Sequence, residues 1–366
     1  MTHFPATRAI YCHPDGTLKD VGDILRNPDM ARTLRRIATH GADDFYTGEI
    51  ARRIADDMEA NGGLIGLGDL AACEPEHTEP LWGTYRGHRI ATNNPPGGGI
   101  MLIEMLNILE HFDLHAIGHN TPEYIRVVSE AMKIATADKD AKVGDPRFVD
   151  VPVAELTSKQ YAAAMAERIK RGERAKVPRF NPGGTESKHT TQICVADAAG
   201  NAFTMTHTLG QPSGVVTDGL GFMYNGAMAV FDPRPGHAGS LAPGKARFTA
   251  LSPTIVFTGK KPFLVLGAPG ATYITMGNLQ AMLNAIDFGM DAQQAVSAPR
   301  FAAVSDTIEI SNRITRTAER DLIGQGYQVK RSPYGFAFAW VNMIRFTAAG
   351  LDGGADPAAD GMVIGV

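Results

Sequence analysis

The hydrophobic pattern of this chain changes near residue 180, and that change limits the folds it can adopt. Before it, apolar residues recur at helical spacing. They predict helices over Met30–His40, Tyr46–Ala60, Ile100–Phe112, Glu123–Asp138 and Val153–Arg171. A basic, loop-like stretch, Arg171–Pro182, ends this part of the chain.

The second half reads as short β-rich runs separated by turns, which is typical of β-hairpins. The predicted strands are Thr191–Ala196, Ala202–His207, Ile255–Phe257, Phe263–Leu266, Thr307–Ile310 and Phe336–Phe346. Further helices are predicted over Tyr273–Ile286 and Ile314–Gln325, and the tail from Ala348 offers little to bury except Met362–Val366. Helices first and paired strands afterwards favour stacked helices and antiparallel sheets over a doubly wound parallel sheet.

Composition excludes several classes of protein. The chain has 35 Lys and Arg residues against 39 Asp and Glu residues, so a dedicated nucleic-acid surface is not expected. Its cysteines, Cys12, Cys73 and Cys194, are odd in number and lack metal-ligand spacing, which argues against a disulfide framework. No run approaches the roughly 18 apolar residues of a membrane-spanning helix. Met1–Tyr11 shows no signal-peptide pattern, which predicts the cytoplasm as given and leaves the periplasm or secretion open if a segment precedes Met1.

Common catalytic motifs are missing from the sequence. It contains no nucleophile-elbow, Walker A or zinc-protease pattern. Three histidines, His111, His115 and His119, are spaced by four, as metal ligands on one helix face would be. Gly118 and Asp113 weaken the helix there, so a solvated helix end is the simpler interpretation, and a metal site is the alternative.

The most informative segment is Glu186–Asn201, in which Thr190 and Thr191 open a β-rich run. A threonine hydroxyl is a poor nucleophile unless a base lies beside it. If the chain is cut before Thr190, its own α-amine, with an ordinary pKa of about 7.7–8.0, can take the proton. The strand would hold both groups rigidly. The alternative is ordinary β-propensity, because two threonines at the start of a strand are common.

This segment resembles the self-cleavage site of the γ-glutamyltranspeptidase family, whose members are N-terminal-nucleophile hydrolases. Other stretches resemble the same family in the same order, from about Tyr11 to the C-terminus: Asp43–Gly48, Asn61–Ile65, Gly144–Pro146, Leu251–Val256, Gly267–Gly270, Ala295–Arg300 and Ala355–Pro357. The resemblance implies an α+β fold, the four-layer αββα sandwich. It also implies a chain that cuts itself and then attacks an amide, with no metal or organic cofactor.

By position, the resemblance implies roles for five residues. Thr190 would be the nucleophile and, after cleavage of the His189–Thr190 bond, the carrier of the base. The hydroxyl of Thr208 would hold the nucleophile in place. The backbone N–H groups of Gly270 and Ala271 would form the oxyanion hole, provided that Ala271 does not require a positive φ.

The substrate-binding positions depart from the family pattern. Where the family holds the substrate's α-ammonium group, this chain has Gly210, Ala227 and Val230, none of which can pair with a cation. The two serines that hold the α-carboxylate are matched by Thr249 and Ala250. Because a buried, unpaired ammonium group is costly, we expect an acyl group with less positive charge beside the scissile bond.

The resemblance begins well inside the family's precursor, so the precursor's N-terminal part has no counterpart here. We expect residues 1–189 to correspond to the end of the large subunit and residues 190–366 to the small subunit. Together they would form one αββα domain that is incomplete at its N-terminus. Such a chain should expose apolar surface and associate.

The expected partners are a small-molecule amide or γ-glutamyl-like substrate, a water or amine acceptor, and the two fragments of the cleaved chain, without nucleic acid or a membrane span. Two alternatives stay open. One is an amidase or acylase for acyl groups that lack the glutamyl α-amine, and the other is an inactive remnant that never matures. Processing tests the remnant, and substrates with and without an α-amine test the acylase.

Overall fold

The computed structural model describes residues 3–178 and 189–365 of the chain. Two compact units divide it, one formed by Met1–Thr78 with Leu209–Gly226 and the other by Glu79–Thr208 with Ala227–Val366. The division predicted from the sequence is a cleavage of the chain between residues 189 and 190, which these spatial units do not test. It therefore stays a prediction.

The smaller unit is mostly helical. Its helices are α1 (Pro5–Tyr11), α2 (Pro28–His40), α3 (Asp43–Tyr46), α4 (Glu49–Ala60) and α5 (Leu67–Ala71), and the strands β5 (Pro212–Val216) and β6 (Met223–Asn225) form a hairpin. A small core of Ile50, Ile54, Leu70 and Leu220 holds the unit together. The two helices predicted around residues 30–60 are confirmed, and the hairpin was not foreseen.

The larger unit is built on a six-stranded sheet in which every neighbouring pair of strands is antiparallel. Its order is β1 (Leu81–Tyr85), β2 (His88–Thr92), β7 (Thr254–Thr258), β8 (Lys261–Gly267), β12 (Asn342–Thr347) and β13 (Gly350–Ala355). A smaller sheet contains β9 (Phe301–Ala302), β10 (Thr307–Ile310) and β11 (Gln328–Arg331). The antiparallel pairing confirms the α+β class that the sequence predicts.

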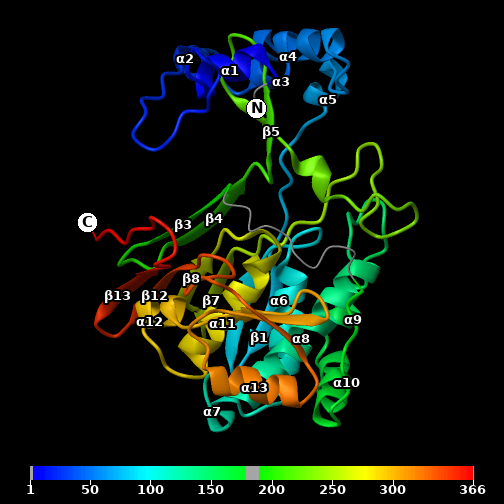
Figure 1. Ribbon diagram of the computed structural model, residues 1–366, viewed down its shortest axis with the longest axis vertical. Helices are drawn as coiled ribbons and strands as arrows, with labels where there is room; N and C mark the ends of the chain where they lie inside the picture. The colour runs from blue at the N-terminus through cyan, green and yellow to red at the C-terminus, as the bar shows by residue number, and fades with distance from the viewer. Residues whose placement is uncertain (1–2, 179–188, 366) are drawn as a thin grey trace. The chain divides into compact units, whose positions relative to one another are not determined.

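Helices cover one face of the six-stranded sheet (Figure 1). The central ones are α6 (Gly99–Leu109), α8 (Pro122–Lys142) and α11 (Ile274–Ile286). All residues of α6 are buried, as expected of a helix that is apolar all round. The remaining helical segments are α7 (Leu114–Ile117), α9 (Val153–Leu156), α10 (Lys159–Lys170), η1 (Ala227–Val230), η2 (Ala271–Tyr273), α12 (Ala292–Ser297) and α13 (Arg316–Gly324).

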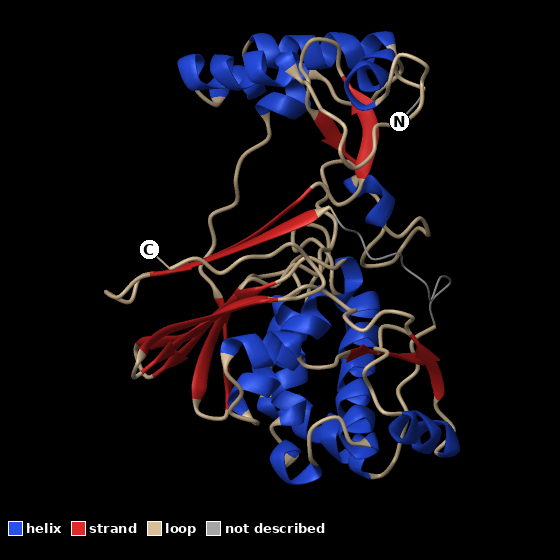
Figure 2. Cartoon of the chain, turned by 60° about the vertical axis from the view of Figure 1, so that its left-hand side comes forward, coloured by secondary structure: helices blue, strands red, loops and turns tan. Residues whose placement is uncertain are grey.

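The hairpin of β3 (Thr190–Ala196) and β4 (Ala202–Thr208) lies against the other face of the sheet, over β8 (Figure 2). Its turn is held by Asp197, whose carboxylate accepts the N–H groups of Ala199 and Asn201. Helices, sheet and hairpin make three layers in this unit. The fourth layer and the incompleteness at the N-terminus stay predictions.

Two predicted elements were wrong in extent. The long strand expected over Phe336–Phe346 begins only at Asn342, because Phe338 and Ala339 adopt positive φ angles of 68° and 75° that no strand accommodates. The helix expected over Val153–Arg171 is two helices, because Ser158 caps α10 by accepting the N–H of Tyr161. The tail after Ala348, for which no element was predicted, contributes the edge strand β13.

Candidate active site

Thr190 and Thr208 lie directly opposite each other at the open end of the hairpin. Their hydroxyl oxygens are 2.8 Å apart, so one donates a hydrogen bond to the other. The Thr208 hydroxyl also lies 3.3 Å from the carbonyl oxygen of His189, the residue before Thr190. Both threonines are half-buried and His189 is exposed. The hydroxyls of Thr190 and Thr208 and the carbonyl of His189, which the sequence predicts to act together, therefore lie next to one another.

The inward face of the hairpin is polar, and this polarity fixes its place on the sheet. Gln192 donates to the hydroxyl of Thr204 at 2.8 Å, and that hydroxyl donates to the carbonyl of Leu266 in β8 at 3.1 Å. Thr206 donates to the Oε1 atom of Gln192. A Cβ atom built on Gly267 would lie 2.3 Å from the same oxygen, so Gly267 permits this close approach.

Gln192 is a residue that the motif search missed. The signal for it was present, because polar side chains alternate with Ile193 and Val195 along the strand. The alternation alone could not show that the polar face points inward. Only the packing against β8 decides this.

The turn Pro269–Ala271 connects β8 to α11, the position expected for an oxyanion hole. Gly270 is buried with a φ of 144°, and Ala271 opens η2 with a φ of 52°. The sequence expectation required that Ala271 not need a positive φ, and the residue adopts one although it is not glycine, so its role as an oxyanion donor rests on its N–H group alone and stays a prediction. Ala271 keeps its N–H group but adopts a left-handed conformation that an L-residue enters at a cost of about 1–2 kcal/mol.

The open end of the β3–β4 hairpin points toward the end of β8 that leads into this turn. Thr204 contacts Leu266, and Gln192, on the partner strand, reaches Gly267, the next residue of β8. Thr190 lies two residues beyond Gln192 on the same face of β3. The open end of the hairpin and the Pro269–Ala271 turn therefore lie toward the same end of β8.

Thr249 and Ala250 belong to a segment tied to the beginnings of two buried helices. The N–H of Thr249 donates to Pro96 before α6 at 2.8 Å, and the carbonyl of Ala250 accepts from Thr275 in α11 at 2.9 Å. Leu251 donates to the Thr249 hydroxyl at 3.3 Å. The main chain of this segment is thus fixed, whereas its side chains offer a single hydroxyl.

Asp145 supports the start of the same segment. The guanidinium of Arg147, together with the N–H of Ala246 at 2.7 Å from the carboxylate, lowers the pKa of the Asp145 carboxyl to about 2. Arg247, the next residue, donates to the carbonyl of Phe248 at 2.9 Å, and burial lowers the pKa of its guanidinium. Asp145 carried no role in the sequence interpretation, although it lies in a stretch that resembles the family.

The three positions expected near a substrate ammonium group are divided between the two compact units. Ala227 and Val230 form the two ends of η1 in the larger unit, and Val230 is 46% exposed. Gly210 belongs to the smaller unit and has a φ of 70°. The sequence of η1 is wholly apolar, so this segment contains no charged side chain.

The three histidines that the sequence offers as possible metal ligands do not lie on one helix. His111, His115 and His119 do not share a helix, because α6 ends at Leu109 and Gly118 closes α7 with a φ of 90°. Within the described residues, no group of three or more His, Cys, Asp or Glu side chains is placed to hold a metal ion.

Glu186, Ser187 and Lys188, which begin the segment that the sequence singles out, lie outside the described residues. Among the helices of the described part, none is long and apolar enough to span a membrane.

Comparison with known proteins identifies the family. A family model described as γ-glutamyltranspeptidase matches residues 1–366, the whole chain. The chain belongs to the γ-glutamyltranspeptidase family. The resemblance of the motifs around Thr190, Thr208 and Gly270 to this family is therefore confirmed as membership.

Individual relatives carry two kinds of name. An acylase ACY 1 proenzyme from a Pseudomonas species is 39% identical over 357 residues, which cover 96% of this chain and 63% of the relative. A glutathione hydrolase proenzyme from Escherichia coli is 37% identical over 311 residues, covering 81% of this chain and 53% of the relative. A crystal structure of cephalosporin acylase from Bacillus halodurans matches with a TM-score of 0.86 at 29% identity, covering 98% of this chain and 65% of that one.

The chain thus spans about half to two thirds of the length of these members of the γ-glutamyltranspeptidase family. Two of these proteins are named acylases and one is named a glutathione hydrolase, and two of the names include the word proenzyme. The fold is shared with the cephalosporin acylase.

Proposed function

We propose that this chain is a γ-glutamyltranspeptidase-family amide hydrolase or acyltransferase that acts through Thr190 after cutting itself at the His189–Thr190 bond. The observation that carries the proposal is the 2.8 Å contact between the hydroxyls of Thr190 and Thr208, beside the carbonyl of His189. A nucleophile held by a neighbouring hydroxyl, next to an amide carbonyl, has the arrangement that acyl transfer needs.

Self-cleavage would begin when the Thr190 oxygen attacks the carbonyl carbon of His189. The C–N bond then breaks, the acyl group moves from nitrogen to oxygen, and the amine of Thr190 takes up the proton. Water hydrolyses the resulting ester, which leaves a carboxylate on His189 and a free amine on Thr190. The Thr208 hydroxyl, 3.3 Å from the His189 oxygen, is placed to donate to it as negative charge develops.

Substrate turnover would repeat the chemistry on an external amide. The free α-amine of Thr190 takes the hydroxyl proton while the oxygen attacks the amide carbonyl, and it returns the proton to the leaving amine. The N–H groups of Gly270 and Ala271, at the start of α11, would stabilise the oxyanion. Water or an amine then releases the acyl group. Each proton moves between Thr190, the leaving amine of the substrate and the water or amine that accepts the acyl group. The scheme therefore needs no cofactor.

A second candidate function is an acylase for acyl groups that lack the glutamyl α-amine. It is favoured by the apolar side chains of Ala227 and Val230, which cannot pair with an ammonium group. The similarity to a relative named as an acylase, at 39% identity over nearly all of this chain, supports the same reading.

The decisive first experiment is intact mass by denaturing mass spectrometry on the purified chain beside Thr190→Ala, Thr208→Val and Thr208→Ser. We expect two fragments from the unmodified chain, the smaller beginning at Thr190, and a single uncut chain from Thr190→Ala. Thr208→Val should slow cleavage by about tenfold or more because it leaves the Thr190 hydroxyl unpaired. Thr208→Ser should restore it. An uncut chain in every sample contradicts the proposal.

The acyl group is tested by comparing γ-glutamyl 4-nitroanilide with glutaryl 4-nitroanilide, which differs only by the missing α-amine. We expect the processed protein to release 4-nitroaniline faster from the glutaryl compound. Substantial release from the γ-glutamyl compound, at an equal or higher rate, would show that the ammonium group is accepted and would overturn the acylase candidate.

A further inference from the structure

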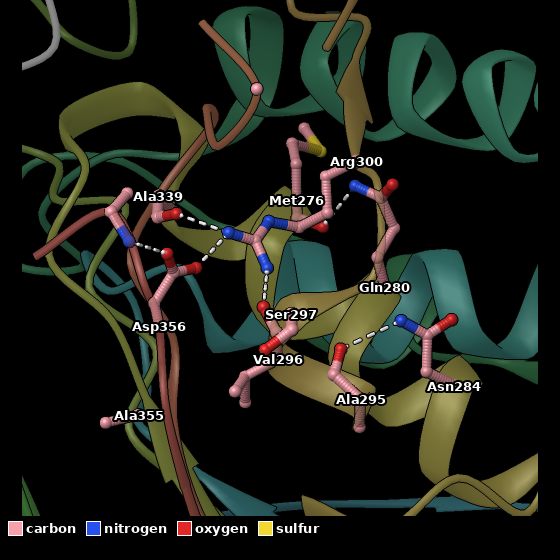
Figure 3. A network of polar contacts seen from close by, with 12 residues as sticks. Met276, Gln280, Asn284, Ala295, Val296, Ser297, Arg300, Ala339, Ala355 and Asp356 are labelled. Carbon is pink, nitrogen blue, oxygen red and sulfur yellow. Dashed lines mark hydrogen bonds and ion pairs between the residues drawn. The ribbon is translucent and has the colours of Figure 1, made fainter. Parts of the chain in front are cut away.

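A buried ion pair lies behind the proposed oxyanion turn. Arg300 is 2% exposed and Asp356 is 1% exposed, and the guanidinium donates to the carboxylate (Figure 3). The same guanidinium donates to the carbonyl of Ala339 at 2.9 Å and to the carbonyl of Val296. Asp356 also accepts the N–H of Ala358 at 2.8 Å. Desolvation offsets much of the attraction in such a pair, whereas removing one partner leaves an uncompensated buried charge.

The conformation that this pair holds is an unfavourable one. Phe338 and Ala339 are buried, and their φ angles of 68° and 75° place two consecutive L-residues in the left-handed region. Arg300 fixes the carbonyl of Ala339 in that conformation. The backbone conformation at Ala339 therefore depends on Arg300, which lies between α12 and β9, and on Asp356, which follows β13.

Ala339 in turn supports the Pro269–Ala271 turn. A Cβ atom built on Gly270 would lie 2.5 Å from the Cα atom of Ala339, so the two backbones are in direct contact. The N–H of Trp340, the next residue, donates to the carbonyl of Pro269 at 2.9 Å. A continuous series of contacts thus links Asp356 through Arg300 and Ala339 to Gly270.

We propose that Arg300 and Asp356 are positioning residues that hold the Gly270 and Ala271 N–H groups in place through the backbone of Ala339. This inference rests on the proposed function for the role of those N–H groups, but the mechanical link stands on the contacts alone. Because oxyanion donors act on charge that develops in the transition state, displacing them lowers kcat and leaves KM nearly unchanged.

The test uses Asp356→Asn and Arg300→Lys in the full chain. Arg300→Lys keeps a positive charge opposite Asp356, so the variant is expected to fold. A single ammonium group cannot, however, reach Asp356, Ala339 and Val296 together. The matched control is Glu130→Gln, which breaks a second buried pair, Glu130 with Lys133 in α8, whose side chains are 0% and 3% exposed.

The first readout is hydrogen–deuterium exchange of the peptides that cover Gly270 and Ala339, measured in the Thr190→Ala background so that every sample is uncut. We expect exchange in these peptides to accelerate by about tenfold or more in both test variants. The Glu130→Gln control should leave them unchanged. Unchanged exchange in both test variants, or equal acceleration in the control, overturns the inference.

The second readout is turnover of the anilide substrates by the processed test variants. We expect kcat to fall by about 100-fold with KM within about twofold of its original value, because a misplaced donor loses most of its effect. A normal kcat overturns the inference. If the unmodified chain neither cuts itself nor releases 4-nitroaniline, the proposed function fails, whereas the exchange measurement still decides whether the ion pair holds the turn.

Discussion

At the scale of single residues, Ala271 is where side-chain chemistry and backbone geometry conflict. Its φ of 52° suits glycine, yet the residue is alanine. Neighbouring contacts maintain this conformation: Trp340 holds Pro269 at 2.9 Å, and Tyr273 donates from its hydroxyl to Glu309 at 2.5 Å. The turn is thus fixed at both ends, and Ala271 carries the strain between them.

This strain leads to a prediction for Ala271→Gly. Glycine keeps the N–H group and removes the left-handed penalty, so we expect the free energy of unfolding to rise by up to about 1 kcal/mol. Processing should be retained. The measurement is the urea midpoint, with Ala281→Gly in the interior of α11 as the control, which should lose about 1 kcal/mol. A lower midpoint for Ala271→Gly would show that the turn is not strained.

At the scale of elements, α6 carries a carboxyl group where a buried helix normally has none. Glu104 is 1% exposed, and its Oε1 atom has no hydrogen-bond partner. Burial, and next the nearby Asp138 on α8, raise the pKa of Glu104 well above its ordinary value of 4.5. The group is therefore neutral in the folded state at pH values where it ionises in the unfolded chain.

The sign of the pH dependence follows. Below pH 4.5 the carboxyl is protonated in both states, so it contributes fully to the folded state. As the pH rises above that value, the unfolded chain releases the proton first, and stability falls until the folded-state pKa is passed. We expect Glu104→Gln to remove this decline and to be the more stable form at neutral pH.

Urea midpoints measured from pH 4.5 upward test this effect on α6. The matched control is Glu155→Gln, whose side chain belongs to the same cluster through Lys142 but is 56% exposed. That control should behave as the unmodified chain. Parallel curves for Glu104→Gln and the unmodified chain would mean that Glu104 ionises normally.

At the scale of the whole molecule, the outward face of the β3–β4 hairpin is apolar and uncovered. Ile193, Val195, Phe203 and Met205 are between 39% and 53% exposed and pair across the two strands. Polar residues face the sheet and apolar residues face outward, the reverse of an ordinary surface hairpin. Such a contiguous patch is typical of an interaction surface.

We expect the chain to associate through this face, as the sequence predicts for a chain with exposed apolar surface. Phe203→Thr combined with Val195→Thr should shift the mass measured by light scattering toward the monomer. Leu64→Thr, which changes an 84% exposed residue in the other compact unit, should not. A monodisperse monomer from the unmodified chain would contradict the prediction.

The sequence by itself determined the elements with strong periodicity and the residues with a chemical signature. The buried helices α6, α8 and α11 and the hairpin around Asp197 were predicted because apolar spacing and turn residues act locally. Thr190, Thr208 and Gly270 were predicted from the resemblance of their surroundings to the family, and their roles stay predictions.

Tertiary structure alone decided how these parts meet. The positive φ angles of Phe338 and Ala339 broke a predicted strand, and they exist because Arg300, remote in sequence, holds the carbonyl of Ala339. The inward direction of the polar hairpin face depends on β8, and the pKa of Glu104 depends on burial beside Asp138. Each is set by contacts between distant segments, whose energies no local pattern in the sequence contains.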